Sequence, residues 1–118
     1  MNTIYCNFAD INYRTHQESL IEHVKKNKMF DDTLSFTKEW LVGTEFYRQN
    51  RSILDRTRLC GYCLWKPYII LEAIKQVSYN DIIVYMDCGD MPKSPEINDH
   101  IKDYLRTVDK YFITQWSL

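Results

Sequence analysis

Two acidic residues in a short loop are the first candidates for chemistry in this sequence. Asp87 and Asp90 stand three positions apart in Asp87-Cys88-Gly89-Asp90, directly after an apolar run. Carboxylates at this spacing can ligate one hard cation, Mn²⁺ or Mg²⁺, which typically bridges to diphosphate oxygens. Gly89 would let the backbone approach a ligand closely. The alternative is that the two carboxylates only cap a turn.

Positive charge and an aromatic ring lie close together ahead of that loop. Arg58 and Lys66 bracket Gly61 and Trp65. Phosphate groups favour the cations, and a base or a sugar can use the flat ring face. The opposing interpretation is that Trp65 is a core residue at the start of a helix and that Lys66 is simply solvated.

A pair of thiols offers a third chemistry. The cysteines are Cys6, Cys60, Cys63 and Cys88. Cys60 and Cys63 are separated by two residues, and a cysteine pair with this spacing at the start of a helix can carry out disulfide exchange. A redox motif of that kind follows a hydrophobic strand, however, and residues 53–59 are too charged for one. The sequence therefore favours two inert thiols, and the scattered histidines supply no second ligand pair for zinc.

Strands and helices that alternate along the chain must position these residues. Hydrophobic patterning predicts strands over residues 3–8, 33–36, 82–86 and 111–114, and the apolar run of residues 82–86 predicts a strand covered on both faces. Helices are predicted from Thr15, from Thr37 toward Leu54 with a break near Gly43, from Pro67 to Val77, and from Pro95 to Val108. This order predicts an α/β fold, a Rossmann-like and mostly parallel sheet with flanking helices.

Ligands of an open α/β sheet bind beyond the carboxyl ends of its strands. Two places meet that condition, the segment Phe8-Ala9-Asp10 after the first strand and the loop that begins at Asp87. Because the helix of Pro67 leads into the strand of Ile82, we expect Lys66 and Asp87 to lie near one another at this edge.

Composition sets the outer limits. The chain has 118 residues, the size of one domain, and its fifteen Lys and Arg against sixteen Asp and Glu give a net charge of -1. With this net charge, the protein has no overall positive electrostatic field that would attract nucleic acid or an anionic membrane. The sequence shows no secretory signal and no stretch that could span a bilayer, so we expect a soluble, cytoplasmic protein with reduced thiols.

The segment from Gly61 to Ile70, followed by the segment from Asp81 to Gly89, resembles a group of nucleotide-diphospho-sugar glycosyltransferases from bacteria and large viruses. The hallmark of that group is a Gly-Tyr-x-x-Trp-Lys-Pro helix start and then a strand ending Tyr-x-Asp-x-Gly. Phe8-Ala9-Asp10 with Tyr13 looks like the group's first strand and nucleotide loop, and Arg58 takes the place of its basic residue ahead of the glycine.

The resemblance implies a GT-A fold that transfers a hexose from a nucleoside diphosphate sugar to a glycan or protein acceptor. Asp10 and Tyr13 would contact the nucleoside, Arg58 and Lys66 would offset the diphosphate charge, and Asp87 would hold a cation or the sugar. The implied donor site as a whole is Ala9, Asp10, Tyr13, Arg58, Trp65, Lys66, Asp87 and Gly89. Gly89 stands where the usual motif has a second acid, so metal ligation would fall to Asp87 alone or with Asp90.

The length departs from the family as well. A GT-A catalytic domain needs about twice this chain, so residues 1–118 are expected to be an N-terminal, donor-binding part that is completed by a C-terminal half or a homo-oligomer. Two rival functions stay open: a thiol-disulfide oxidoreductase using Cys60 and Cys63, and a non-catalytic interaction module whose aromatic residues bind another protein.

Overall fold

The fold is built on a parallel sheet. The computed structural model describes residues 2–58, 61, 63–88, 99–100 and 103. Its strands are β1 (Thr3–Ala9), β2 (Asp32–Thr37) and β3 (Ile82–Tyr85), all parallel and in the order β2-β1-β3. The predicted α/β class is thereby confirmed. The predicted strand over 111–114 and the helix toward Val108 lie outside the described residues.

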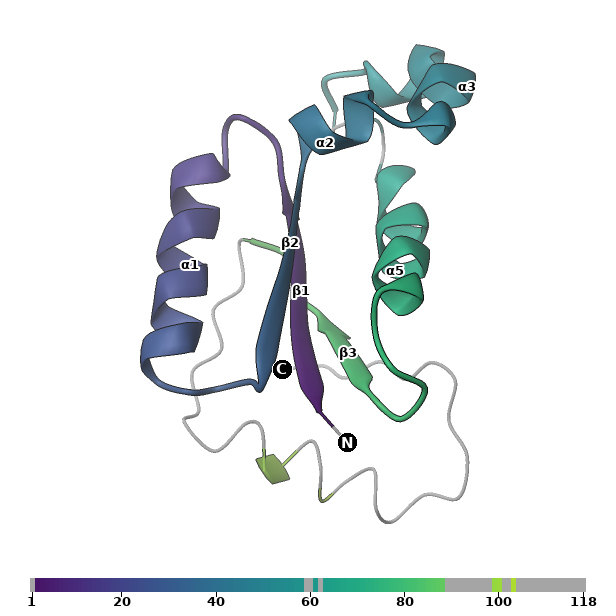
Figure 1. Ribbon diagram of the computed structural model, residues 1–118. Helices are drawn as coiled ribbons and strands as arrows, with labels where there is room; N and C mark the ends of the chain where they lie inside the picture. The colour runs from purple at the N-terminus through teal and green to yellow at the C-terminus, as the bar shows by residue number, and fades with distance from the viewer. Residues whose placement is uncertain (1, 59–60, 62, 89–98, 101–102, 104–118) are drawn as a thin grey trace.

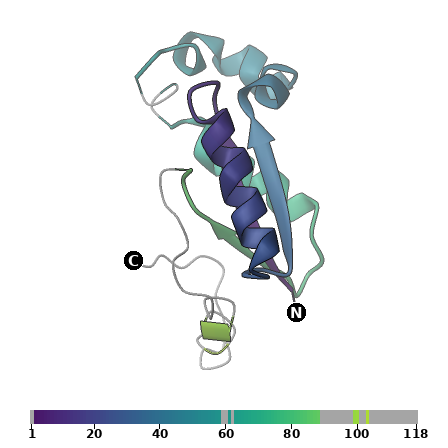
Figure 2. The ribbon, with the colours of Figure 1, turned by 90° about the vertical axis from the view of Figure 1, so that its left-hand side faces the viewer.

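Helices cover both faces of the sheet. They are α1 (Arg14–Lys26), α2 (Lys38–Val42), α3 (Glu45–Leu54) and α5 (Trp65–Lys75). Helix α1 lies on one face and α5 on the other, while α2 and α3 sit beyond the carboxyl end of β2 (Figure 1). The view turned by 90° shows α1 running along the strands in front of them (Figure 2). None of the helices in the described part is long and apolar enough to cross a membrane.

Strand β1 lies in the middle of the sheet, and all seven of its residues are buried. Successive side chains point to opposite faces of a strand. Cys6 and Phe8 accordingly join the core cluster under α5, and Tyr5 joins the cluster with Val24 of α1. The four residues of β3 also pack to both sides, but each stays half-buried. The predicted strand over 82–86 is therefore present over Ile82–Tyr85, one residue shorter and with less complete cover than its apolar character suggested.

The helix starts follow from local sequence. Thr37 Oγ1 accepts a hydrogen bond from the amide of Trp40 at 3.2 Å, and Thr44 Oγ1 accepts one from the amide of Tyr47 at 3.1 Å. Each threonine satisfies an amide that has no partner inside its helix. The predicted cap at Thr37 and the predicted break near Gly43 are both confirmed.

Helix α5 begins at Trp65, so Pro67 is its third residue. A proline is tolerated in the first turn because the amides there have no helical acceptor. The helix ends at Lys75, two residues before the predicted end at Val77. Its start places Lys66 at the same end of the molecule as the carboxyl ends of the strands.

Candidate functional site at the carboxyl edge of the sheet

The carboxyl edge brings a cation and an acid into contact. Lys66 Nζ lies 3.1 Å from Asp87 Oδ1 and 3.4 Å from Asp87 Oδ2. Lys66 comes from the first turn of α5, and Asp87 follows β3. The predicted proximity of the two residues is therefore confirmed. Their side chains are 34% and 52% exposed, so the pair is open to a ligand from solvent.

Two aromatic rings support the Lys66 ammonium. Lys66 Nζ lies 5.5 Å from the ring centre of Tyr85 and 5.8 Å from that of Trp65, within the range of a cation–π contact. Trp65 itself stacks on Phe8 of β1 with 4.1 Å between ring centres. The core therefore fixes the base of the lysine while its charged end stays at the surface.

Trp65 belongs to the core. Its side chain is only 7% exposed, and its Nε1 is buried without a hydrogen-bond partner among the described residues. Because Phe8 covers one face of the ring, the indole is not an open platform for a base or a sugar. The structure thus agrees with the core interpretation of Trp65, whereas Lys66 is held in an ion pair and is not simply solvated.

The Tyr85 hydroxyl and the Cys88 thiol, which flank Asp87 at this edge, stay protonated. Burial raises the pKa of the Tyr85 hydroxyl, and the adjacent Asp87 carboxylate raises it further. Burial also raises the pKa of Cys88 to about 11, with smaller contributions from the charges of Asp87 and Asp10. The Cys88 thiol donates to the carbonyl of Phe8 at 3.2 Å. Neither group is ionised near neutral pH, so neither adds a negative charge beside the Lys66–Asp87 pair.

The loop between β1 and α1 forms the adjoining part of the edge. Ala9 is buried at the end of β1, and Asp10 Oδ1 accepts a hydrogen bond from the amide of Asn12 at 2.9 Å. The amide of Tyr13 donates to the carbonyl of Asp10 at 3.1 Å, and the Tyr13 side chain is 51% exposed. Because the Cys88 thiol donates to the carbonyl of Phe8 and Cys88 packs in one cluster with Ala9, the two predicted ligand-binding segments lie at one edge.

Other predicted site residues are not joined to the pair. Arg58 is exposed after α3, and within the described residues it makes no ion pair with Asp87. Gly89 and Asp90 lie outside the described residues. No group of three or more His, Cys, Asp or Glu gathers within the part of the chain that the structure describes. Both carboxylate oxygens of Asp87 face Lys66. Because Asp90 is not described, metal binding by Asp87 and Asp90 stays a prediction.

The predicted thiol pair is only half described. Cys63 lies in the turn before α5 with a φ of 62°, and Cys60 lies outside the described residues. Cys6 and Cys88 are buried free thiols. The burial of Cys6 raises its pKa to about 12. Neither buried thiol is a nucleophile near neutral pH, and disulfide exchange at Cys60 and Cys63 stays an alternative.

A buried polar network beneath this edge was not predicted. Gln17 Nε2 donates to Asn7 Oδ1 at 3.0 Å and to the carbonyl of Phe36 at 2.9 Å, which ties α1 to β1 and β2. An ion pair of 3.0 Å between Arg14 and Glu39 joins the start of α1 to α2 at the surface. The polar Asn7 inside an apolar strand was the one available signal in the sequence, but its partners are distant in the chain.

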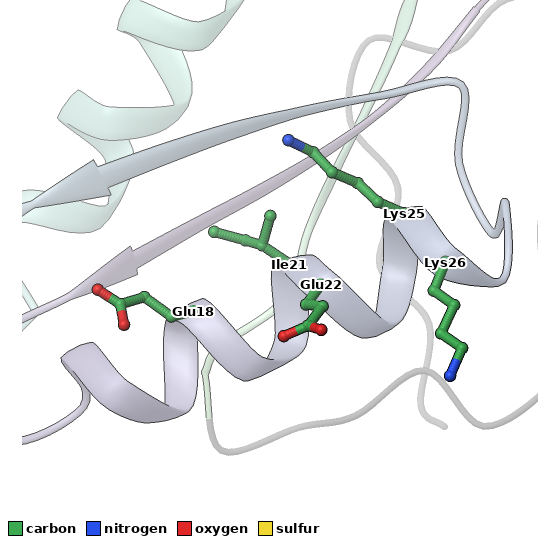
Figure 3. A pocket seen from close by; sticks show the side chains of 5 residues that line it. All are labelled: Glu18, Ile21, Glu22, Lys25 and Lys26. Atoms are coloured by element: carbon green, nitrogen blue, oxygen red, sulfur yellow. The ribbon is translucent and has the colours of Figure 1, made fainter.

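A hollow along α1 is separate from this edge (Figure 3). Its lining residues are Glu18, Ile21, Glu22, Lys25 and Lys26. All five belong to one helix and lie beyond its first turn, whereas α1 begins at the carboxyl edge of the sheet. The mixed charges of this wall are those of an ordinary solvated helix face.

No protein-family model, curated protein or solved structure matches this chain. Its function is therefore to be inferred from the chemistry of the carboxyl edge.

Proposed function

We propose that this chain binds the donor of a glycosyltransferase reaction, a nucleoside diphosphate sugar, at the carboxyl edge of its sheet. The observation that carries the proposal is the Lys66–Asp87 pair, 3.1 Å apart and open to solvent beyond β3. A parallel α/β sheet binds ligands at this edge. The pair offers a cation for a diphosphate and a carboxylate that can accept hydrogen bonds from sugar hydroxyls or ligate a cation.

The start of α1 supports the same assignment. Its first turn has no acidic residue, and Tyr13 at the N-cap position makes no side-chain cap. The amides of an uncapped helix start favour an anion, and the loop that carries Asp10 leads directly into them. In the proposed complex, Asp10 and the half-exposed Tyr13 contact the nucleoside, and Lys66 contacts the diphosphate. Ala9 ends the strand on which this loop is built.

The proposed chemical contribution is electrostatic. Cleavage of the bond between the hexose and the diphosphate leaves negative charge on the departing oxygen, and a positioned ammonium stabilises that charge. Mn²⁺ or Mg²⁺ bound by Asp87 would supply further positive charge when present. The proposal gives none of the described residues the role of catalytic base, and its acceptor is a glycan or a protein.

Titration calorimetry with UDP and with GDP, each without and with Mn²⁺, tests this proposal. We expect one nucleotide to bind, and we expect Lys66→Gln to weaken binding by about tenfold because a charge-assisted hydrogen bond is lost. Lys75→Gln is the matched control, since Lys75 forms an ion pair with Glu72 at 2.9 Å near the other end of the same helix. Failure of both nucleotides to bind in every condition would contradict the proposal.

The same preparation distinguishes the rival functions. Alkylation under denaturing, non-reducing conditions should label Cys6, Cys60, Cys63 and Cys88 if all four are thiols. Protection of Cys60 and Cys63 that a reductant removes would favour the oxidoreductase. Absence of nucleotide binding together with four reactive thiols would favour an interaction module.

A further inference from the structure

We propose that Asp87 restrains Lys66, so that a bound diphosphate must take the lysine away from the carboxylate. This inference rests on the proposed function, because it assumes that Lys66 meets the diphosphate. The inference is drawn from the geometry of the Lys66–Asp87 pair, which determines how much positive charge the carboxyl edge presents to an anion.

The Lys66 ammonium is already neutralised in this structure. Asp87 Oδ1 and Oδ2 lie 3.1 Å and 3.4 Å from Lys66 Nζ, so both carboxylate oxygens face the cation. A second carboxylate, that of Asp10, follows Ala9, and Ala9 packs in one cluster with Cys88, the neighbour of Asp87. The Lys66, Asp87 and Asp10 side chains together therefore present no net positive charge to an anion.

A phosphate that approaches Lys66 consequently meets two costs. It competes with Asp87 for the ammonium, and it brings negative charge toward a carboxylate. For charges exposed to water, the loss of an ion pair and the repulsion between two like charges each change affinity by at most about fivefold. Removing the Asp87 charge should therefore tighten metal-free diphosphate binding by about threefold to tenfold.

The alternative role for Asp87 predicts the opposite sign. The Tyr85 and Trp65 rings already support the ammonium at 5.5 Å and 5.8 Å, so the lysine retains neighbours that orient it when the carboxylate is gone. If Asp87 instead positions Lys66, its replacement weakens binding. The direction of the change separates restraint from positioning.

The experiment is calorimetric titration of inorganic pyrophosphate and of the preferred nucleoside diphosphate in EDTA. The proteins are wild type, Asp87→Asn, Asp87→Ser, Lys66→Met and the double variant Lys66→Met with Asp87→Asn. We expect both Asp87 variants to bind about threefold to tenfold tighter than wild type. In the Lys66→Met background the same Asp87→Asn change should give a smaller gain, because no ammonium is released. Glu72→Gln is the matched control, since it removes the carboxylate of the exposed Lys75 pair and should leave binding unchanged.

Unchanged or weaker binding by Asp87→Asn and Asp87→Ser, with wild-type circular dichroism, would overturn the restraint. An equal gain in both lysine backgrounds would overturn it too, since the effect would then be general repulsion. If wild type binds through Lys66 and Asp87→Asn binds no tighter, the inference fails and the proposed function stands. If neither wild type nor the Asp87 variants bind pyrophosphate or nucleotide in EDTA, the inference fails, and the proposed function fails with it only if UDP and GDP also do not bind in the presence of Mn²⁺.

Discussion

Gly61 constrains the backbone that leads into the site. Its φ is 80°, and a Cβ built at this position would lie 2.6 Å from the Cα of Leu54 and 2.8 Å from the carbonyl oxygen of Ile53. The amide of Gly61 donates to the carbonyl of Arg56 at 2.9 Å. A glycine is required here both by the left-handed conformation and by the close approach of the end of α3. This turn also fixes where α5 begins, and hence where Lys66 lies.

Replacement of Gly61 by alanine is predicted to lower the free energy of unfolding by about 2–4 kcal/mol, because left-handed strain and a backbone clash add together. The control is Gly43→Ala, since Gly43 has a right-handed φ of -77° and its added Cβ would meet the carbonyl of Trp40 at an ordinary 3.4 Å. The control should lie within about 0.5 kcal/mol of wild type. Urea unfolding followed by circular dichroism compares the two, and equal effects would show that the turn does not need a glycine.

The two buried thiols predict a loss of stability in alkali. The pKa of Cys6 is raised from 9.0 to about 12 and that of Cys88 from 9.0 to about 11, chiefly by burial. Both thiols are protonated in the folded and unfolded chains well below pH 9.0, so no stability is lost there. Above that pH the unfolded chain releases protons that the folded chain keeps, and stability falls until the folded pKa values are reached.

Unfolding in urea at neutral pH and at about pH 10 should show a loss of about 1 kcal/mol for each buried thiol. Cys88→Ala, measured at both pH values, provides the control, because it removes one of the two titrating groups. Its stability should fall by less than that of wild type over the same interval. A difference between the two pH values that is the same for wild type and Cys88→Ala would rule out this account of Cys88.

Helices α2 and α3 owe their separation to Thr44. Its hydroxyl donates to the carbonyl of Leu41 at 2.6 Å and accepts from the amide of Tyr47 at 3.1 Å, so it closes α2 and opens α3. Tyr47 then donates to Asp55 Oδ1 at 2.5 Å, and Arg51 meets Asp55 Oδ2 at 3.0 Å. Lys38 lies over the Tyr47 ring and donates to the carbonyl of Leu54 at 2.8 Å. These contacts hold the end of α3 against Lys38 at the start of α2.

Thr44→Ala is predicted to lower the free energy of unfolding by about 1–2 kcal/mol, because the amide of Tyr47 and the carbonyl of Leu41 both lose a partner. Thr44→Ser keeps the hydroxyl and should stay within about 0.5 kcal/mol of wild type. Chemical unfolding of both variants provides the measurement. Equal destabilisation by serine and alanine would assign the effect to the lost methyl group and not to the cap.

Local signals predicted the elements of the described residues well, and long-range contacts account for what was missed. Thr37 and Gly43 are cap and break residues whose effect depends on near neighbours, so the sequence predicts them. The burial of Asn7 in β1 depends on Gln17 and on the carbonyl of Phe36, which no periodicity can pair in advance. The motif around Lys66 identified Trp65 and Asp87 together, but the packing of Phe8 decides that the indole is buried while the ammonium is exposed.

The arrangement of the sheet predicts how the whole molecule opens. Strand β1 is hydrogen-bonded to a strand on each side, and all its residues are buried beneath α1 on one face and α5 on the other. Strand β2 follows a pattern of exposed and half-buried residues with Phe36 alone buried, and α2 has five residues. Amides in such peripheral elements exchange through local opening, whereas central amides exchange only when the domain unfolds.

Hydrogen–deuterium exchange read by mass spectrometry should therefore show the slowest exchange in peptides covering Thr3–Ala9. Peptides covering α2 should exchange faster, because a short helix at the rim has few buried contacts. Moderate urea should accelerate the β1 peptides strongly and the α2 peptides weakly, since only global unfolding exposes a large surface. Exchange in β1 that is as fast as in α2, with the same weak response to urea, would mean that the sheet opens from its centre, and the site that Lys66 and Asp87 form above it would then lack a rigid base.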